Sequence, residues 1–289
     1  MKYGTVCAYW TDHWSNDDYS DFARKIKELG FDVIELPAGD LLKISDQKLY
    51  DLKALTNELG LQISSNIGPP RDKNISSANP EIRKNGIEFL QNIICAMNKA
   101  GSKILVGAMY NCWPYDFEDL DKPAIWERAV NSMKTLSAFS EQYDVTLSLE
   151  ILNRFETNLL NTCEEGVNFC RDVDCKNVNL LLDTFHMNIE EDDLPNAIRK
   201  AGNLLGHLHV GEGNRRLPGC GHIPWKEIGR ALNDIGYTNA VVMEPFLKPG
   251  GEVGSDIKVW RDLSNNADQN GMDEQISQSL KFLKSVFEV

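Results

Sequence analysis

Short apolar segments alternate with longer amphipathic segments along this chain. β-Branched and aliphatic residues are concentrated at 4–9, 32–36, 61–66, 103–108, 145–150, 178–183, 205–210 and 240–245, and the starts of these segments are 27 to 42 residues apart. Segments with helical periodicity lie between them, at 17–29, 46–59, 80–100, 124–142, 162–173 and 224–235. Repeated strand–helix units build a parallel sheet. Eight such strands predict an α/β fold, the (β/α)₈ TIM barrel.

Residues typical of helix ends stand at the borders of the helical segments. Pro80 follows Asn79, as at the start of a helix, and Thr162 with Glu165 forms a capping-box pattern. Glycine favours the left-handed conformation that ends helices, and it follows four of the segments, at Gly30, Gly60, Gly101 and Gly236. A further helix is predicted at about 272–289. Since no linker divides the chain, we expect residues 1–289 to form a single (β/α)₈ barrel domain with this C-terminal helix.

An open, doubly wound α/β sheet is the alternative to the barrel. A dinucleotide-binding sheet of that kind carries a G-x-G-x-x-G motif after its first strand, and this chain has none there. The barrel is therefore favoured.

Charge and cysteine content narrow the range of partners. With 43 acidic and 30 basic residues, and a net charge of −13, the chain would repel a phosphate backbone, so we expect no nucleic-acid partner. No apolar run approaches the roughly 20 residues of a membrane helix, so we expect no membrane partner. The first residues lack the pattern of a secretory leader, and the seven cysteines form no C-x-x-C pair. These features predict a cytoplasmic protein that binds a small, uncharged molecule.

Four consecutive predicted strands carry an acidic residue or a histidine near their carboxyl ends. These residues are Glu150, Asp183, His209 and Glu244, and side chains at this end of a barrel converge on one mouth. Two like charges about 4 Å apart repel by about 4 kcal/mol at an effective dielectric of about 20, so three carboxylates need protons or a cation. Oxygen ligands with one imidazole favour an open site for Mn²⁺, Mg²⁺ or Co²⁺ over a closed structural Zn²⁺ site. The alternative is that each acid pairs separately with a lysine or arginine inside the barrel.

Polar and aromatic residues follow the same strand ends. The loops that we expect to contact substrate hydroxyl groups contain Asn153, Arg154, Glu156, His186, Glu212, Asn214 and Arg215. In the alternative interpretation, the two arginines Arg154 and Arg215 tie loops together through Glu156 and Glu212. Further residues predicted to line the substrate site are Trp14, Gly107, Trp113 and Phe246. His207 faces the barrel interior one layer deeper than His209, and we interpret it as a hydrogen-bonded core histidine.

The chain resembles the ketose 3-epimerases, the family that includes D-tagatose 3-epimerase and D-psicose (D-allulose) 3-epimerase. The resemblance runs nearly end to end and is carried by KELGFDVIEL, NPEIRKNG, LEILNRFE, LLDTFHMNIEED, GHLHVGEGNRR, VVMEPF and GSDIKVWRDLS. It implies a (β/α)₈ barrel, a homo-oligomer (dimer or tetramer), and epimerisation at C3 of free ketohexoses such as D-fructose/D-psicose or D-tagatose/D-sorbose. Many relatives have tyrosines where this chain has Val6, Cys7 and Cys112, so the resemblance does not carry over an order of preference among ketoses.

The resemblance also implies roles for individual residues. A divalent metal ion would be bound by Glu150, Asp183, His209 and Glu244. The first candidate ion is Mn²⁺, with Co²⁺ or Mg²⁺ as alternatives. Glu150 and Glu244 would also be the two acid/base residues. The oxygens near the reacting carbons would be contacted by Glu156, His186 and Arg215.

Inversion of a carbon next to a carbonyl requires a proton to leave one face and another to return to the opposite face. We therefore expect Glu150 and Glu244 to divide the two proton transfers between them, with a metal ion stabilising the enediolate.

The nearest alternative function is a metal-dependent aldose–ketose isomerase on the same barrel. An abasic-site endonuclease of related fold is less consistent with five histidines and a net charge of −13. A non-catalytic sugar-binding protein would not need two carboxylates in its metal site.

Overall fold

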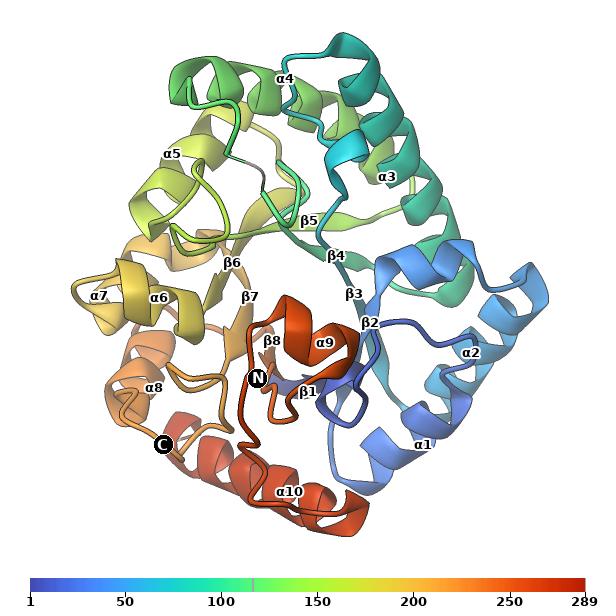
Figure 1. Ribbon diagram of the computed structural model, residues 1–289, viewed down its shortest axis with the longest axis vertical. Helices are drawn as coiled ribbons and strands as arrows, with labels where there is room; N and C mark the ends of the chain where they lie inside the picture. Colours follow the sequence, from blue (N-terminus) through green and yellow to red (C-terminus); the bar gives the residue numbers. More distant parts are fainter. Residues whose placement is uncertain (116, 289) are drawn as a thin grey trace.

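Eight parallel strands close into a barrel in the computed structural model, which describes residues 1–115 and 117–288 (Figure 1). Each strand pairs with its neighbour in sequence, and the first pairs with the last. The strands are β1 (Lys2–Val6), β2 (Val33–Pro37), β3 (Gln62–Ile67), β4 (Ile104–Gly107), β5 (Thr146–Glu150), β6 (Val178–Asp183), β7 (Leu205–Val210) and β8 (Ala240–Met243). The predicted (β/α)₈ barrel is confirmed, and the open sheet is wrong.

Helices surround the barrel and connect its strands (Figure 1). The six predicted helical segments correspond to α1 (Ser20–Glu28), α2 (Asp46–Leu59), α3 (Pro80–Ala100), α4 (Lys122–Glu141), α5 (Cys163–Val173) and α8 (Trp225–Asp234). The other helices are α6 (Thr184–Glu190), α7 (Leu194–Ala201), α9 (Gly251–Asp256) and α10 (Gln269–Phe287). Short 3₁₀ turns are η1 (Cys7–Tyr9), η2 (Ala38–Leu42), η3 (Arg71–Lys73) and η4 (Gly202–Leu204).

The residues predicted at helix ends adopt the conformations that those ends require. The Asn79 side chain accepts a hydrogen bond from the backbone of Glu81, and Pro80 opens α3. Thr162 and Glu165 form the reciprocal capping box of α5. Positive φ angles between 65° and 87° are found at Gly30, Gly60, Gly101 and Gly236. Local sequence thus fixes where these helices begin and end.

Three differences from the predicted elements have physical causes. The first strand covers 2–6 instead of 4–9, because the chain turns into η1 at Cys7. Helices α6 and α9 have only 7 and 6 residues, too few to show a helical period in the sequence. The last helix spans 269–287, and the predicted end at residue 289 lies outside the described residues.

The segment after β8 folds back over the loop after β1. Helix α9 lies inside the ring of outer helices, above the strands (Figure 1). The backbone N–H of Val253 donates to the carbonyl of Asp12 over 3.1 Å, and the Trp14 indole donates to Asp256 over 2.8 Å. These contacts join residues that are more than 230 positions apart in sequence. The two ends of the barrel sequence therefore build one side of its mouth together.

The interior of the barrel contains polar residues where hydrophobic packing is usual. Glu35 of β2, Ser64 of β3 and His207 of β7 are all essentially inaccessible to solvent. The Ser64 hydroxyl donates to Glu35, which shows that their side chains point into the same interior space. Such a layer of buried polar groups is costly unless its members are paired. Among the described residues, no helix is both long enough and apolar enough to span a membrane.

Candidate metal and substrate site

Four strand ends bring three carboxylates and one imidazole together. Glu150 and Asp183 are the last residues of β5 and β6, and Glu244 directly follows β8. The sheet register pairs Asp183 with His209 of β7. Each of the four side chains offers an atom within 4.8 Å of those of the others. The structure therefore gathers all four residues that the sequence singled out as a candidate metal site.

The His209 ring presents one nitrogen to the carboxylates. Its Nδ1 lies 3.6 Å from Oε1 of Glu150 and 3.7 Å from Oε1 of Glu244. The ring is buried, and its Nδ1 has no hydrogen-bond partner among the described residues. An unpartnered imidazole nitrogen beside three carboxylate groups is a donor set that suits a divalent cation with open positions.

One arginine balances part of the negative charge. Nη1 of Arg215 lies 3.0 Å from Oδ2 of Asp183 and 2.7 Å from Oε2 of Glu244. Although burial would raise the pKa of Asp183, the charge of Arg215 lowers it. Burial raises the pKa of Glu244 to about 8 against the opposing charges of His209 and Arg215. A single guanidinium cannot balance three carboxylates, so the separate pairing of each acid with its own cation is wrong.

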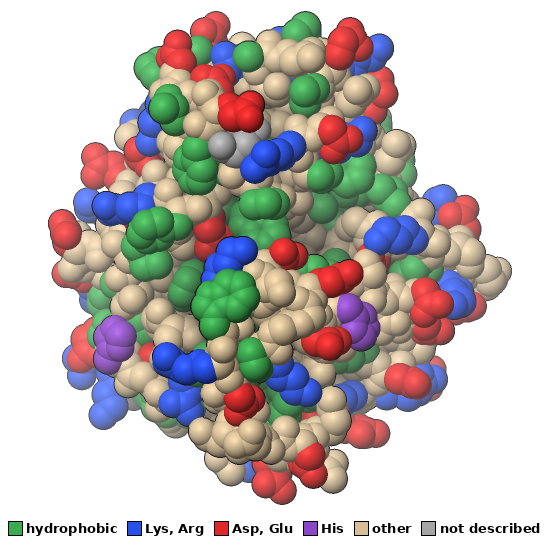
Figure 2. Space-filling model, viewed as in Figure 1, with side chains coloured by type: hydrophobic (Ala, Val, Ile, Leu, Met, Phe, Trp, Pro, Cys, Tyr) green, Lys and Arg blue, Asp and Glu red, His purple; other side chains and the backbone are tan. Residues whose placement is uncertain are grey.

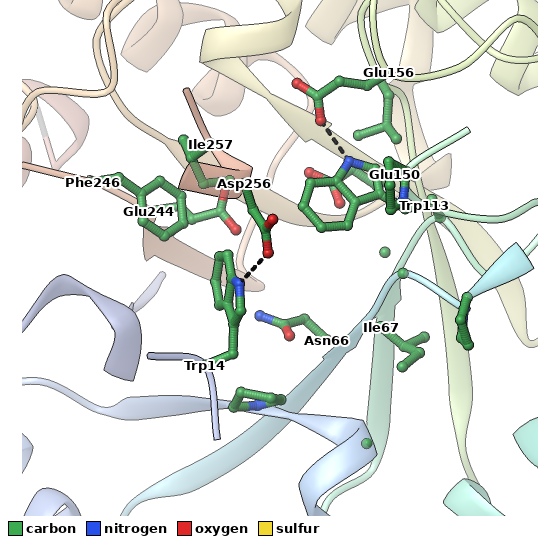
Figure 3. Close-up of a pocket in the computed structure, with 18 of the residues that line it drawn as sticks. Trp14, Asn66, Ile67, Trp113, Glu150, Glu156, Glu244, Phe246, Asp256 and Ile257 are labelled. Carbon is green, nitrogen blue, oxygen red and sulfur yellow. Dashed lines mark hydrogen bonds between the residues drawn. The ribbon is translucent and has the colours of Figure 1, made fainter. Parts of the chain in front are cut away.

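A cavity of about 540 Å³ opens above this cluster (Figure 3). Its lining includes both predicted acid/base residues and seven residues predicted to contact the substrate: Trp14, Gly107, Trp113, Glu150, Glu156, His186, Arg215, Glu244 and Phe246. The other polar residues of the predicted loops, Asn153, Arg154, Glu212 and Asn214, are not among the described residues that line it. Asp183 and His209 lie beneath them and are fully buried. Figure 2 shows hydrophobic side chains among acidic and basic ones around the hollow on this face. The cavity thus combines apolar walls with a polar, acidic floor.

The His186 side chain has a defined orientation. Its Nδ1 accepts the backbone N–H of Asn153 over 3.1 Å, so a neutral ring carries its proton on Nε2. That nitrogen lies 3.6 Å from Asp183 and 3.8 Å from Glu150. His186 therefore presents a donor to the space between the two carboxylates.

Glu156 is fixed at the wall of the cavity by two donors. The Trp113 indole donates to Glu156 over 2.8 Å, and the Asn153 amide donates over 3.0 Å (Figure 3). Burial would raise the pKa of Glu156, but His186 and Arg215 lower it. Glu156 is therefore an ionised acceptor for a substrate hydroxyl group.

The alternative interpretation, in which Arg154 and Arg215 tie loops together through Glu156 and Glu212, is wrong because both arginines have other partners. Arg154 pairs with Glu190, through Nε at 2.9 Å and Nη2 at 2.8 Å. The Arg215 guanidinium lies 3.8 Å above the Phe185 ring and contacts site carboxylates instead of Glu212. Glu212 is buried and anchors its own loop, because it accepts hydrogen bonds from the backbone of Gly219 and Ile223 and from the Trp225 indole.

Three residues for which the family resemblance implies tyrosines in many relatives lie outside the cavity lining. Val6, Cys7 and Cys112 are buried, and the described residues that line the cavity do not include them. The Cys112 thiol lies 3.5 Å from the Asn74 amide. The lining of the cavity includes instead Asn66, Asp256 and Ile257 (Figure 3).

Sequence reasoning missed Glu35. Its Oε2 lies 3.1 Å from Nε2 of His207, and its Oε1 lies 2.9 Å from Nε2 of His209. His207 is buried, as predicted, but its ring nitrogens make no aligned hydrogen bond among the described residues. Glu35 lies in the middle of a strand, not at its end. The available signal was an acidic residue within the otherwise apolar run VIEL.

The chain resembles known proteins over its full length. Residues 23–285 match the family model of the xylose isomerase-like TIM barrel. The D-psicose 3-epimerase of Ruminiclostridium cellulolyticum is 46% identical over 289 residues, which cover 100% of this chain and 98% of that protein. The D-psicose 3-epimerase of Agrobacterium fabrum is 44% identical, with 99% of each chain covered. A crystal structure of D-psicose 3-epimerase with D-tagatose from Clostridium cellulolyticum H10 has a TM-score of 0.98 at 46% identity, with 100% of both chains covered.

Proposed function

The chain is an isomerase that belongs to the ketose 3-epimerases, within the family of xylose isomerase-like TIM barrels, and from this premise we propose that it inverts C3 of free ketohexoses at a divalent-metal site. The observation that carries the proposal is the meeting of Glu150 and Glu244. They come from β5 and from the end of β8, which are separated by two strands around the barrel. Two carboxylates that approach one cavity from different sides can serve opposite faces of a carbon atom.

Each of the two acids carries out one of the two proton transfers. One of Glu150 and Glu244 removes the C3 proton, and the other, protonated, returns a proton to the opposite face, so that an enediolate lies between the two steps. The roles exchange in the reverse direction. Asp183 and His209 would complete the ligand set around the cation, and the cation, when bound, supplies Lewis-acid polarisation of the ketose carbonyl.

Three further residues hold the substrate oxygens in position for proton transfer. The Nε2 proton of His186 and the guanidinium of Arg215 are donors for the oxygens on C2 and C3, while the Glu156 carboxylate accepts from a hydroxyl group. Holding the reacting atoms in place removes part of the entropic barrier to proton transfer. Trp14, Trp113 and Phe246 provide apolar walls for the carbon chain.

The substrate class follows from the cavity and from the relatives. Acidic groups dominate the polar part of the lining, which disfavours a phosphorylated sugar and favours a neutral one. The two relatives compared above are named D-psicose 3-epimerases, and one solved relative was crystallised with D-tagatose. We therefore assign the pairs D-fructose/D-psicose and D-tagatose/D-sorbose as candidate substrates. Mn²⁺ is the first candidate ion, followed by Co²⁺ and Mg²⁺, and the enzyme is expected to be a cytoplasmic dimer or tetramer.

An isotope experiment tests the activity. Purified protein is stripped of metal, supplied with Mn²⁺ and D-fructose in D₂O, and followed by ¹H and ¹³C NMR. We expect D-psicose to form with deuterium at C3. An aldose product, with or without deuterium at C1 or C2, would instead identify an aldose–ketose isomerase, and the formation of neither D-psicose nor an aldose would contradict both functions.

A further inference from the structure

The two nitrogens of the His209 ring face different surroundings. Nδ1 faces Glu150 and Glu244 at the floor of the cavity. Nε2 faces away from the cavity, toward the Glu35 carboxylate at 2.9 Å. We propose that Glu35 is a positioning residue for the metal site, which accepts the Nε2 proton of His209 and so leaves the Nδ1 lone pair directed at the ion. This inference rests on the metal site proposed above.

A metal-ligating histidine needs a partner for its second nitrogen. A carboxylate there fixes the ring orientation and the tautomer, and it increases the basicity of the ligating nitrogen. The Glu35 oxygen lies 2.9 Å from Nε2 of the buried His209 ring, which leaves no space for a water molecule between them. This Nε2 has no aligned hydrogen bond among the described residues, and the Glu35 oxygen lies at hydrogen-bond distance but off the N–H direction. Hydrogen bonds at catalytic sites are often misaligned before the site is loaded.

Glu35 is itself held in place from two sides. The Ser64 hydroxyl donates to Oε2 over 2.8 Å, and the Asn66 amide donates to Oε1 over 3.3 Å. β2 and β7 are separated by β1 and β8 around the barrel, and these bonds hold the Glu35 carboxylate in the barrel interior beside His209. Asn66 also lines the substrate cavity. A continuous set of contacts therefore runs from the cavity wall through Glu35 to the candidate metal ligand.

A second ion among Glu35, His207 and His209 is the competing interpretation, because their ligand atoms also lie within 4.8 Å of one another. The Glu35 oxygens already accept from Ser64 and Asn66, which leaves them less free to bind a cation. Glu35 and His207 are fully buried and are absent from the lining of the cavity. These observations favour a hydrogen-bonding role for the cluster.

Metal affinity tests the inference without measuring turnover. Mn²⁺ is titrated calorimetrically into the metal-stripped protein and into its Glu35→Gln and Ser65→Ala variants. We expect Glu35→Gln to weaken Mn²⁺ binding by about 10- to 100-fold, and Ser65→Ala to change it by less than about twofold. Ser65 is the matched control, because it is a buried residue of β3 next to Ser64 and its hydroxyl donates to Ser102, away from Glu35. Circular dichroism and thermal melting establish that both variants are folded.

A spectroscopic measurement on the wild-type protein covers the case in which Glu35→Gln does not fold. In Co²⁺-loaded protein, the ring N–H of a ligating histidine gives a strongly shifted proton signal that is lost on exchange into D₂O. We expect one such signal, exchanging slowly because Nε2 is buried against Glu35.

Each other outcome is decisive. Equal Mn²⁺ affinity in wild type and Glu35→Gln, or the absence of an exchangeable signal in the Co²⁺ form, would overturn the role of Glu35 and leave the metal site intact. Two bound ions per wild-type chain would also overturn it. Failure of the wild-type protein to bind either ion would contradict the proposed metal site itself.

Discussion

Nη1 of Arg215 lies 2.7 Å from Oε2 of Glu244, and the same nitrogen lies 3.0 Å from Oδ2 of Asp183. A single guanidinium group therefore links two strand ends at the floor of the cavity. Its Nε makes no hydrogen bond among the described residues, and its flat face lies 3.8 Å above the Phe185 ring. Arg215 is held by charge and by stacking, so its removal affects both stability and the site.

Replacement of Arg215 by methionine leaves two buried carboxylates without their cation. We expect Arg215→Met to lower the free energy of unfolding of the metal-free protein by about 3 to 5 kcal/mol, as measured by urea denaturation. The control is Arg154→Met, because Arg154 is exposed and its ion pair with Glu190 contributes far less to stability than a buried pair. Equal losses in the two variants would contradict the central position of Arg215.

Replacement of either proposed acid/base residue by its amide removes a proton carrier and a metal ligand while conserving volume. We expect Glu150→Gln and Glu244→Gln each to reduce kcat for ketose epimerisation by at least about 10²- to 10⁴-fold. NMR detection of the product measures the loss, and circular dichroism verifies the fold. Turnover close to wild type in either variant would show that another group moves the proton.

Removal of the metal should affect both activity and stability. Chelation with EDTA is expected to abolish epimerisation, and Mn²⁺ or Co²⁺ to restore it. A ligand that binds only the folded state at 100 times its dissociation constant stabilises that state by about 2.7 kcal/mol, so Tm should rise with added Mn²⁺. An unchanged Tm together with full activity in EDTA would exclude a metal-dependent mechanism.

The ion pair between Arg154 and Glu190 predicts a pH-dependent contribution to stability. Hydrogen bonds from Arg154 lower the pKa of Glu190 below its usual value. A carboxyl group whose pKa is lower in the folded than in the unfolded protein stabilises the fold above the unfolded-state pKa, and this stabilisation is lost as the pH falls through the folded-state pKa. The difference in unfolding free energy between wild type and Arg154→Met should therefore be present at neutral pH and should disappear in acid. A difference that is unchanged at low pH would show that Arg154 contributes by packing alone.

The barrel and the floor of its cavity could be predicted from local features of the sequence. Strand ends such as LSLE at Glu150 and NLLLD at Asp183 show both the strand and the residue at its carboxyl end. Because parallel strands of a closed barrel direct these ends to one mouth, the convergence of the four candidate ligands followed from the fold itself. The register between β6 and β7 then places Asp183 beside His209.

Other features depend on contacts between distant segments and could not be predicted in this way. Glu35 gives no sign in the sequence of what lies opposite it, because its neighbour His209 is 174 positions away. Helix α9 is too short to show a helical period, and the place of Asp256 in the cavity wall depends on its contact with Trp14. The partner of Arg154 also lies on another element, which the charge pattern of its own loop could not identify.

The wall formed by Trp14 and Asp256 joins residues that are 242 positions apart. All four candidate ligands lie between residues 150 and 244, whereas this flank of the cavity is closed only where the first and last segments of the chain meet. Different segments of the chain therefore supply the ligands and shield them from solvent. Proton transfer between carbon and carboxylate requires both.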